Sequence, residues 1–305
     1  MKKLIIGLLV LFLLLMPVAC AKETAPTPTP APSPTPTPAS APAPRPAPPP
    51  PFQGSVVPEE AHYLPGERVE VKFTLTNVSS DPITLDTYPP EMQVKPTRQE
   101  GIEFSIAAGT QPLEISPNDT ITLEFTWDQK DAEGKQVSPG WYDVIFNDIT
   151  IMQGSGHSYG LSPRGRVLIQ YPQGAMEKTI ELDQSRTAND ITVTLESIEL
   201  TATGMTAYAF GTLPGYASPS GPLATSPFMH VFAEYSVDGG IVKQAGSAGM
   251  QYLENGTRFI WNRYVDPVPS DAKELIFRIS TITLSFAPDK PDELVGSWEF
   301  KVPLE

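Results

Sequence analysis

The feature that most constrains this chain is an alternation of apolar and polar residues with a period of two. Residues 69–75 place Val, Val, Phe and Leu at every second position, and 121–127 and 191–195 repeat the pattern. Such alternation is typical of antiparallel strands that bury one face and expose the other. No amphipathic helical pattern of ten or more residues is present. We therefore predict an all-β chain made of antiparallel β-sandwiches.

Turn-forming residues separate the predicted strands at intervals that suit sandwiches. They include Pro65-Gly66, Pro117-Asn118-Asp119, Pro139-Gly140, Asp238-Gly239-Gly240 and Asn255-Gly256. A length of 305 residues suggests about two domains. We place the boundary near Pro172–Gly174, where a strand predicted over 166–171 ends. This gives immunoglobulin-like sandwiches over 52–173 and 174–305.

Two later strands change their apolar phase midway. Leu195 belongs to one face, whereas Ile198 and Leu200 belong to the other, and a similar change separates 275–279 from 282–286. A β-bulge or a bend would shift the phase in this way. A strand buried on both faces is the alternative.

The N-terminus is typical of an export signal. Met1–Lys3 is positively charged, and the apolar run that follows ends at Met16. The run is shorter than the roughly 20 residues that a transmembrane helix needs, so we interpret it as a signal peptide.

The residues that follow resemble the lipobox of bacterial lipoproteins. Val18-Ala19-Cys20 matches that motif, although leucine is usual where Pro17 stands. The resemblance implies that 1–19 is removed and that Cys20 is lipidated, which would anchor the exported chain to a membrane on its extracytoplasmic side. Ordinary cleavage within Ala19-Cys20-Ala21 is the alternative.

A Pro/Ala/Thr-rich linker completes the N-terminal region, 20–51. Its segment 24–51 contains 14 of the 35 prolines and no large apolar residue. Such a composition cannot build a core and favours polyproline II. At ~3.1 Å per residue the segment would extend for roughly 80–90 Å. We interpret it as a disordered spacer between the membrane and the sandwiches, with a ligand for a proline-binding module as the alternative.

Composition excludes several functions. The formal net charge is −14, which is contrary to the clustered positive charge of a nucleic-acid-binding surface. One cysteine cannot form a disulfide framework or a Cys zinc site, and three histidines make a multi-His metal site improbable. We expect no metal, no cofactor and no nucleic-acid partner.

The first predicted sandwich resembles the bacterial intracellular proteinase inhibitor (BsuPI-like) family over about 60–146. The matching residues are Asn77, Trp127, Asp131, Gly134, Gly140 and Tyr142. The resemblance implies an immunoglobulin-like fold, in which Gly140 permits a tight turn and Tyr142 buttresses it from a tyrosine corner. Inhibition does not follow, because the chain is exported and no inhibitory loop is identifiable. The second sandwich resembles surface-lipoprotein modules only loosely.

Motifs for catalysis and metal binding lack their required context. Gly156–Gly160 has the G-x-S-x-G pattern of hydrolases, but Pro163 and Gly165 prevent the helix that must follow the serine. Asp128, Asp131 and Glu133 lack EF-hand spacing and are interpreted as a solvated hairpin turn. We expect no catalysis.

Aromatic residues and two loops are the candidates for binding. Trp261 and Tyr264 lie in a strand that is apolar on both faces, Tyr216 lies in the loop 213–227, and His157 and Tyr159 lie in the predicted loop 153–164. We expect a surface module that binds an envelope protein or a glycan. The alternatives are an extracellular protease inhibitor and a structural or assembly protein. The sequence does not determine the oligomeric state.

Overall fold

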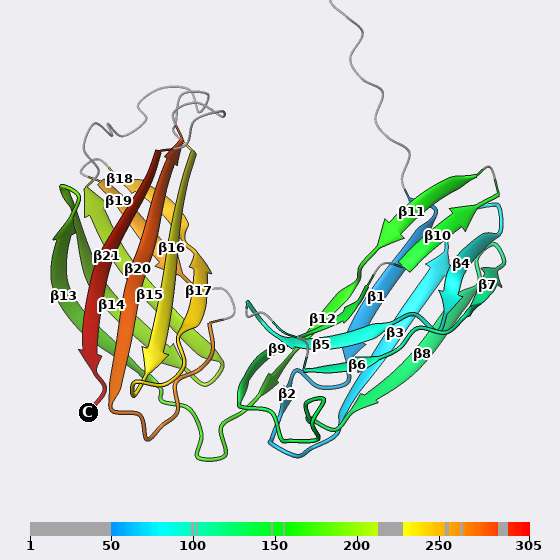
Figure 1. Cartoon of the computed structure of the whole chain (residues 1–305), viewed down its shortest axis with the longest axis horizontal. Coiled ribbons are helices and arrows are strands. Elements are labelled where there is room, and N and C mark those ends of the chain that lie inside the picture. Colours follow the sequence, from blue (N-terminus) through cyan, green and yellow to red (C-terminus); the bar gives the residue numbers. More distant parts are fainter. Residues whose placement is uncertain are drawn as a thin grey trace, which may run out of the picture. The chain divides into compact units, whose positions relative to one another are not determined.

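The computed structural model describes residues 50–98, 101, 103–147, 149–154, 156–212, 228–253, 256–262, 265–285 and 292–305. These residues contain β-strands and turns and no helix, which confirms the all-β prediction (Figure 1). They belong to one compact unit, Pro49–Glu305. Within this described part, no helix is long and apolar enough to cross a membrane. Cys20 and the linker as far as residue 49 lie outside it.

The first sandwich comprises the following strands: β1 (Phe52–Pro58), β2 (His62–Tyr63), β3 (Val69–Asn77), β4 (Ile83–Tyr88), β5 (Met92–Pro96), β6 (Phe104–Ile106), β7 (Gln111–Ile115), β8 (Thr120–Trp127), β9 (Gly140–Phe146), β10 (Ile149–Gln153), β11 (His157–Leu161) and β12 (Arg164–Ile169). One sheet has the order β1-β3-β8. The other layer consists of two sheets, β11-β10-β4-β7 and β2-β12-β9-β5-β6. Consecutive strands of the chain, such as β4 and β5 or β9 and β10, lie one in each of these sheets. Apart from the parallel pair β2 and β12, the strand pairs of this sandwich are antiparallel.

Residues from both layers form the core of the first sandwich, and its corners are fixed by buried polar contacts. Trp127 is fully buried in this core. The Nδ2 of Asn77 donates to the backbone oxygens of Asp81 and Ile115 at 2.8 and 3.0 Å, which ties two turns together. The hydroxyl of Tyr142 donates to the backbone oxygen of Ser138 at 2.7 Å, which is the geometry of a tyrosine corner. The immunoglobulin-like assignment itself stays a prediction.

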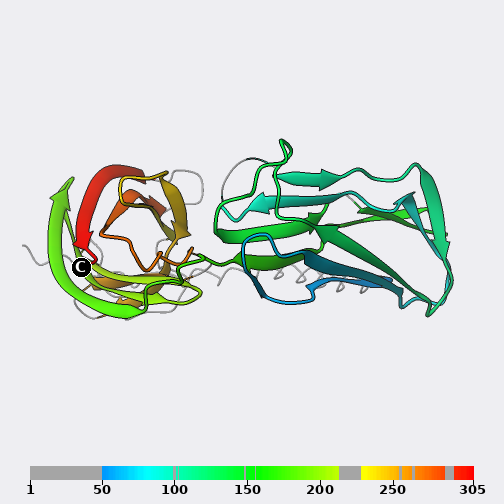
Figure 2. The ribbon, with the colours of Figure 1, turned by 90° about the horizontal axis from the view of Figure 1, so that it is seen from below.

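The second sandwich comprises these strands: β13 (Lys178–Ala188), β14 (Ile191–Thr201), β15 (Gly204–Thr212), β16 (Phe228–Val237), β17 (Lys243–Ser247), β18 (Gly249–Leu253), β19 (Gly256–Trp261), β20 (Glu274–Ser285) and β21 (Asp292–Pro303). They form two sheets, β13-β14-β15-β19-β18 and β17-β16-β20-β21. Figure 2 views this sandwich nearly along its strands and shows the sheets facing each other. A separate core lies between them, with Trp261, Phe277 and Trp298 among its largest side chains.

β-Bulges cause the two changes of apolar phase. The register of β14 against β15 shifts between Leu195 and Ser197, so Leu195 and Ile198 both point into the core. The register of β20 against β21 shifts between Ile279 and Thr281, which brings Ile282 inward after Ile279. The alternative of a strand buried on both faces is therefore wrong at these two places.

Side chains close one seam of the second sandwich. Gln184 and Arg186 of β13 donate to the backbone oxygens of Lys301 and Glu299 on β21, each at 3.1 Å. Lys178 donates to the backbone oxygen of Leu304. The guanidinium of Arg186 also stacks over the ring of Phe300, at 5.7 Å from the ring centroid. Edge carbonyls of β21 are thus satisfied by β13 side chains instead of a neighbouring backbone.

Candidate functional site

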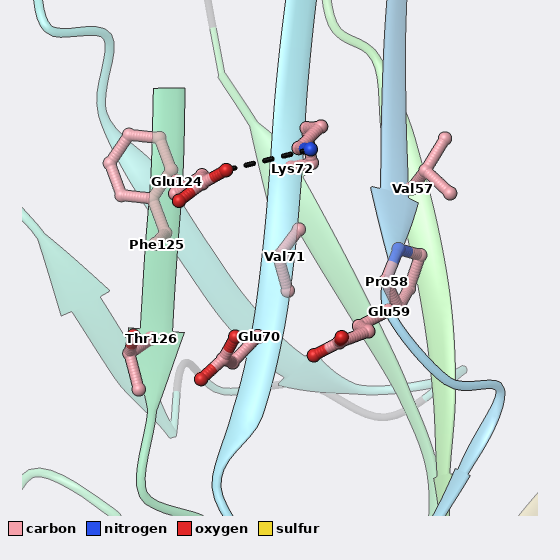
Figure 3. A pocket seen from close by; sticks show the side chains of 9 residues that line it. All are labelled: Val57, Pro58, Glu59, Glu70, Val71, Lys72, Glu124, Phe125 and Thr126. Atoms are coloured by element: carbon pink, nitrogen blue, oxygen red, sulfur yellow. Dashed lines mark ion pairs between the residues drawn. The ribbon is translucent and has the colours of Figure 1, made fainter. Parts of the chain in front are cut away.

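A groove of about 400 Å³ lies on the outer face of the sheet β1-β3-β8 and is the first candidate site (Figure 3). Strand register assembles it. Val57, Lys72 and Glu124 lie in one row across the three strands. Glu70 lies opposite Thr126 in the next row, and the backbone N–H of Glu59 donates to the backbone oxygen of Glu70 at 2.9 Å. Residues distant in the chain therefore meet on one surface.

Three carboxylates and one ammonium group give this groove an acidic character. The Nζ of Lys72 lies 3.5 Å from an oxygen of Glu124, but both side chains are more than half exposed, at 54% and 77%. Such an exposed pair contributes at most about 1 kcal/mol and does not hold the two charges together. Figure 3 shows Glu59 and Glu70 toward the other end of the groove. The groove therefore has two further carboxylates, those of Glu59 and Glu70, in addition to the Glu124 carboxylate that lies beside Lys72.

Apolar surface accompanies these charges. The side chain of Val57 is 56% exposed, and Pro58 beside it is half-buried. Buried Val71 and Phe125 belong to the same lining. A hollow with both apolar surface and a few oriented polar groups suits recognition of a ligand. Farther along this sheet the outward positions are hydroxyls, and Ser55 and Thr74 bond each other at 2.6 Å.

A second polar cluster surrounds Asp266, which follows β19. The carboxylate of Asp266 is nearly buried and accepts from the backbone N–H of Trp141 at 2.8 Å and from the Nζ of Lys243 at 2.6 Å. The backbone N–H of Asp266 donates to the hydroxyl of Tyr235 at 3.1 Å. Gly140, with φ of +148°, lies against the carboxylate, where a Cβ would meet it at 3.0 Å. Glycine is therefore required at this position. We call Asp266, Lys243, Tyr235 and Trp141 the Asp266 cluster.

Burial perturbs the ionisable groups at this cluster. It raises the pKa values of Tyr142, Tyr171 and Tyr235 above the ordinary value of 10.0. For Lys243, burial lowers the pKa and the nearby Asp266 carboxylate raises it, and the net pKa is raised. Perturbed pKa values often mark active sites, but ion pairs that stabilise structure cause them too. The paired, hydrogen-bonded geometry here is that of a structural contact.

Of the predicted binding residues, those that the structure describes, Trp261, His157 and Tyr159, are not brought together. Trp261 is 1% exposed and lies in the core, so its indole offers no surface to a glycan or a protein. The ring lies inside because β19 alternates, with Phe259 and Trp261 inward and Ile260 on the other face. Tyr216 and Tyr264 lie outside the described residues. Trp127 and Trp298 are also fully buried. Trp141 is half-buried, and its Nε1–H donates to the backbone oxygen of Thr203 at 2.9 Å.

The predicted loop 153–164 is wrong, because most of it is strand. Gln153 ends β10, and His157 begins β11, which pairs with β10 through a turn at Gly156 with φ of +81°. Tyr159 is half-buried and packs edge-on against Phe52, with ring centroids 5.9 Å apart. This aromatic contact packs β11 against β1. His157 is exposed at the hairpin end.

The motifs considered for catalysis and metals have ordinary structural surroundings. Ser158 is exposed in the edge strand β11, where it lies opposite Met152 of β10. An oxygen of Asp131 accepts from the backbone N–H groups of Glu133 and Lys135 at 3.0 and 2.8 Å, which closes the hairpin turn. Among the described residues, no cluster of His, Cys, Asp and Glu side chains could hold a metal ion.

The sequence interpretation missed the groove residues Glu59, Glu70, Lys72 and Glu124. Their alternation did predict that Glu70, Lys72 and Glu124 face away from the core. The sequence did hold one indication of a site: charged residues occupy these outward positions, whereas threonine occupies the other outward positions of the same strands. The register between distant strands was needed to place them together.

Comparison with known proteins identifies no family. No family of proteins and no curated protein matches the chain. A conserved domain protein from Bacillus anthracis is 10% identical with a TM-score of 0.32, over 85% of this chain and 89% of that one. Spo0M, a sporulation control protein from Bacillus subtilis, is 12% identical with a TM-score of 0.29, over 52% and 78%. The BsuPI-like resemblance therefore stays a prediction.

A third solved structure is an enzyme. A β-glucosidase from Erythrobacter marinus is 15% identical with a TM-score of 0.24, and the match covers 39% of this chain. The same match covers 15% of that enzyme's chain. None of these likenesses is strong enough to support an argument about function.

Proposed function

We propose that the chain is a non-catalytic lipoprotein of the cell envelope that binds another protein through its β-sandwiches. The membrane part of the proposal comes from the sequence, in which a signal peptide, a lipobox-like Cys20 and a proline-rich linker precede the sandwiches. Acyl chains on Cys20 would anchor the mature chain, and the linker would hold the sandwiches away from the lipid.

The acidic groove on β1-β3-β8 supports protein binding. It combines apolar surface at Val57 and Pro58 with carboxylates of Glu59, Glu70 and Glu124. A single segment of a polypeptide can carry both apolar side chains that match this surface and basic side chains that match these carboxylates. A glycan would need exposed aromatic rings for stacking, but of the four tryptophans, which all lie in the described part of the chain, Trp127, Trp261 and Trp298 are in the cores and Trp141 is half-buried. Protein is therefore the favoured partner.

The proposal can be tested by crosslinking in the host cell. The full chain, with an affinity tag at its C-terminus, is expressed beside a variant with Glu70→Gln and Glu124→Gln. A matched control replaces Glu114 and Glu133, which are also exposed carboxylates of the first sandwich. We expect one saturable protein partner that the groove variant fails to capture and the control retains.

Other outcomes separate the alternatives. Capture of a secreted protease, with inhibition of its activity, would favour the protease-inhibitor hypothesis over the proposal. Capture of glycan alone, or no specific capture from cells in which the tagged chain is folded and exported, would overturn protein binding.

A further inference from the structure

We propose that strand β8 extends its sheet by pairing with a basic, amphipathic segment of a partner polypeptide. The inference rests on the proposed protein-binding function and names the chemistry of the partner. In β-strand addition, main-chain hydrogen bonds give affinity and alternate side chains give specificity. Three features of β8 and the groove determine that chemistry.

The first feature is the edge of the sheet. β8 is the terminal strand in the order β1-β3-β8 and pairs with β3 along its length. Within the described part of the chain, no strand pairs with its other side. Every second residue of such an edge presents unpaired N–H and C=O groups outward, which form a template for another strand.

Three other edges in the structure are blocked. The edge of β21 is covered by Gln184 and Arg186, as described above. At β17 the Nε1–H of Trp261 donates to the backbone oxygen of Gly246 at 3.2 Å. β7 contains Pro112, which has no N–H to donate. Compared with these three edges, β8 contains no proline, and no strand of the described residues pairs with its outer side.

The second feature is apolar surface on the inward side of β8. Phe125 and Trp127 are buried, but Ile121 and Leu123 at the same phase are only partly buried. Leu113 on the preceding strand is partly buried as well. An added strand would cover these side chains with apolar residues at every second position.

The third feature is charge on the outward side. The outward residues of an added strand would lie beside Glu124, with Glu70 one strand farther away. Glu59 adds a third carboxylate to the groove, against the single positive charge of Lys72. Lysine or arginine at the outward positions would complement these charges. The net charge of −14 would also draw a cationic segment toward the molecule. The occupant is thus an extended segment in which basic and apolar residues alternate.

The test uses the full chain in mild detergent and synthetic peptides of about ten residues, the length of a long strand. The first peptide alternates lysine and valine. The second has the same composition in two blocks, and the third alternates glutamate and valine. Fluorescence anisotropy gives the affinities, and hydrogen exchange reports protection of the β8 backbone. Glu70→Lys with Glu124→Lys is the groove variant, and Glu114→Lys with Glu133→Lys is the matched control.

We expect the alternating lysine peptide to bind at least about tenfold more tightly than the other two, and the groove variant to lose at least about tenfold in affinity. Binding should slow exchange at 120–127 and leave the β13 segment unchanged. Equal binding of the block peptide, or no added protection of β8, would overturn strand pairing. Loss of affinity in both variants alike would overturn recognition by the groove.

The host experiment remains separate from this one. A captured partner without a basic alternating segment would overturn the present inference and leave the proposed function intact. Capture of a second copy of this chain would do the same, because its contact would be self-association. Peptide binding without any captured protein would instead count against the proposed function.

Discussion

Removal of the Asp266 side chain should cost considerable stability. Its carboxylate is the acceptor for the Trp141 backbone N–H and the charge partner of Lys243. Replacement by alanine would leave a largely buried ammonium group and an N–H without this partner. Removing one member of a buried pair costs about 3–5 kcal/mol, and here the lower end applies because Lys243 is 23% exposed.

We predict that Asp266→Ala lowers the free energy of unfolding by about 3 kcal/mol in denaturant titrations followed by circular dichroism. Asp266→Asn should cost less, because an amide oxygen can still accept from Trp141. The exposed Asp271 provides a control whose alanine variant should change stability by less than about 0.5 kcal/mol. A similar loss for Asp266→Ala and Asp271→Ala would show that the buried pair is not important for folding.

The tyrosines near Asp266 make stability sensitive to alkali. Their pKa values are raised in the folded protein, chiefly by burial, so folding favours the protonated phenol. The pKa of Lys243 is raised as well, which favours its ammonium form. A group whose pKa is raised by folding contributes its full stabilisation below the unfolded pKa and loses it as the pH rises through the folded value. All four groups therefore act in the same direction.

We predict that the free energy of unfolding falls as the pH rises above about 10, with tyrosinate absorbance appearing together with unfolding. Tyr235→Phe should lower the free energy of unfolding by about 1 kcal/mol near neutral pH, because the backbone N–H of Asp266 loses the Tyr235 hydroxyl as its acceptor. The variant should also show a shallower fall of stability at alkaline pH. Wild-type and Tyr235→Phe curves that stay parallel up to alkaline pH would contradict this assignment.

At the scale of single elements, the side chains of β13 protect the edge of β21. Gln184 and Arg186 occupy its carbonyl oxygens, and Arg186 also covers the ring of Phe300. An uncovered edge strand can pair with another molecule. We predict that Gln184→Ala with Arg186→Ala changes stability only modestly but increases association through β-strands, measured by light scattering and thioflavin fluorescence.

A control for this prediction lies on the same strand. The hydroxyls of Ser185 and Thr187 bond to Thr194 and Thr192 within their own sheet, at 2.8 Å each. Their alanine variants should therefore leave association unchanged. Equal association of both double variants would mean that the β21 edge is protected by something other than these two side chains.

The elements were predictable from sequence wherever alternation was regular. The 69–75 alternation became β3, and the phase change after Leu195 became a bulge, because apolar residues on both sides of it reach the same core. Strand β11 was missed, since its glycines and serines suggested a flexible hairpin loop and the contact of Tyr159 joins it to Phe52, which is far away in the sequence. Local composition cannot reveal such a tertiary contact.

The candidate site was predictable only in part. The outward phase of Glu70 and Glu124 follows from alternation, but their meeting on neighbouring strands depends on the register between β3 and β8. Asp266 gave no signal beyond its place between Val265 and Pro267, because its partners Trp141 and Lys243 lie far away in sequence. Trp261 was expected at a binding surface, but its side chain is buried in the core of the second sandwich.

At the scale of the whole molecule, the decisive question is whether Cys20 anchors the chain. We predict that Cys20→Ser moves the protein from the membrane fraction to the soluble fraction of the host, as judged by immunoblotting, and abolishes labelling by radioactive fatty acid. Two or more acyl chains anchor stably, at ~0.8 kcal/mol for each buried CH₂, and a serine carries none. Pro17→Leu improves the lipobox match and should process at least as completely as the wild type.

Two results would contradict the anchor. Wild-type protein released without label would indicate ordinary signal cleavage within Ala19-Cys20-Ala21. Membrane retention of Cys20→Ser would assign the anchoring to the uncleaved apolar segment instead. The first result changes where the groove acts, because segment 24–51 can extend only roughly 80–90 Å from its attachment point. With either anchor in place, a partner for β8 must come within about that distance of the membrane; for a released chain, the partner can be anywhere outside the cell.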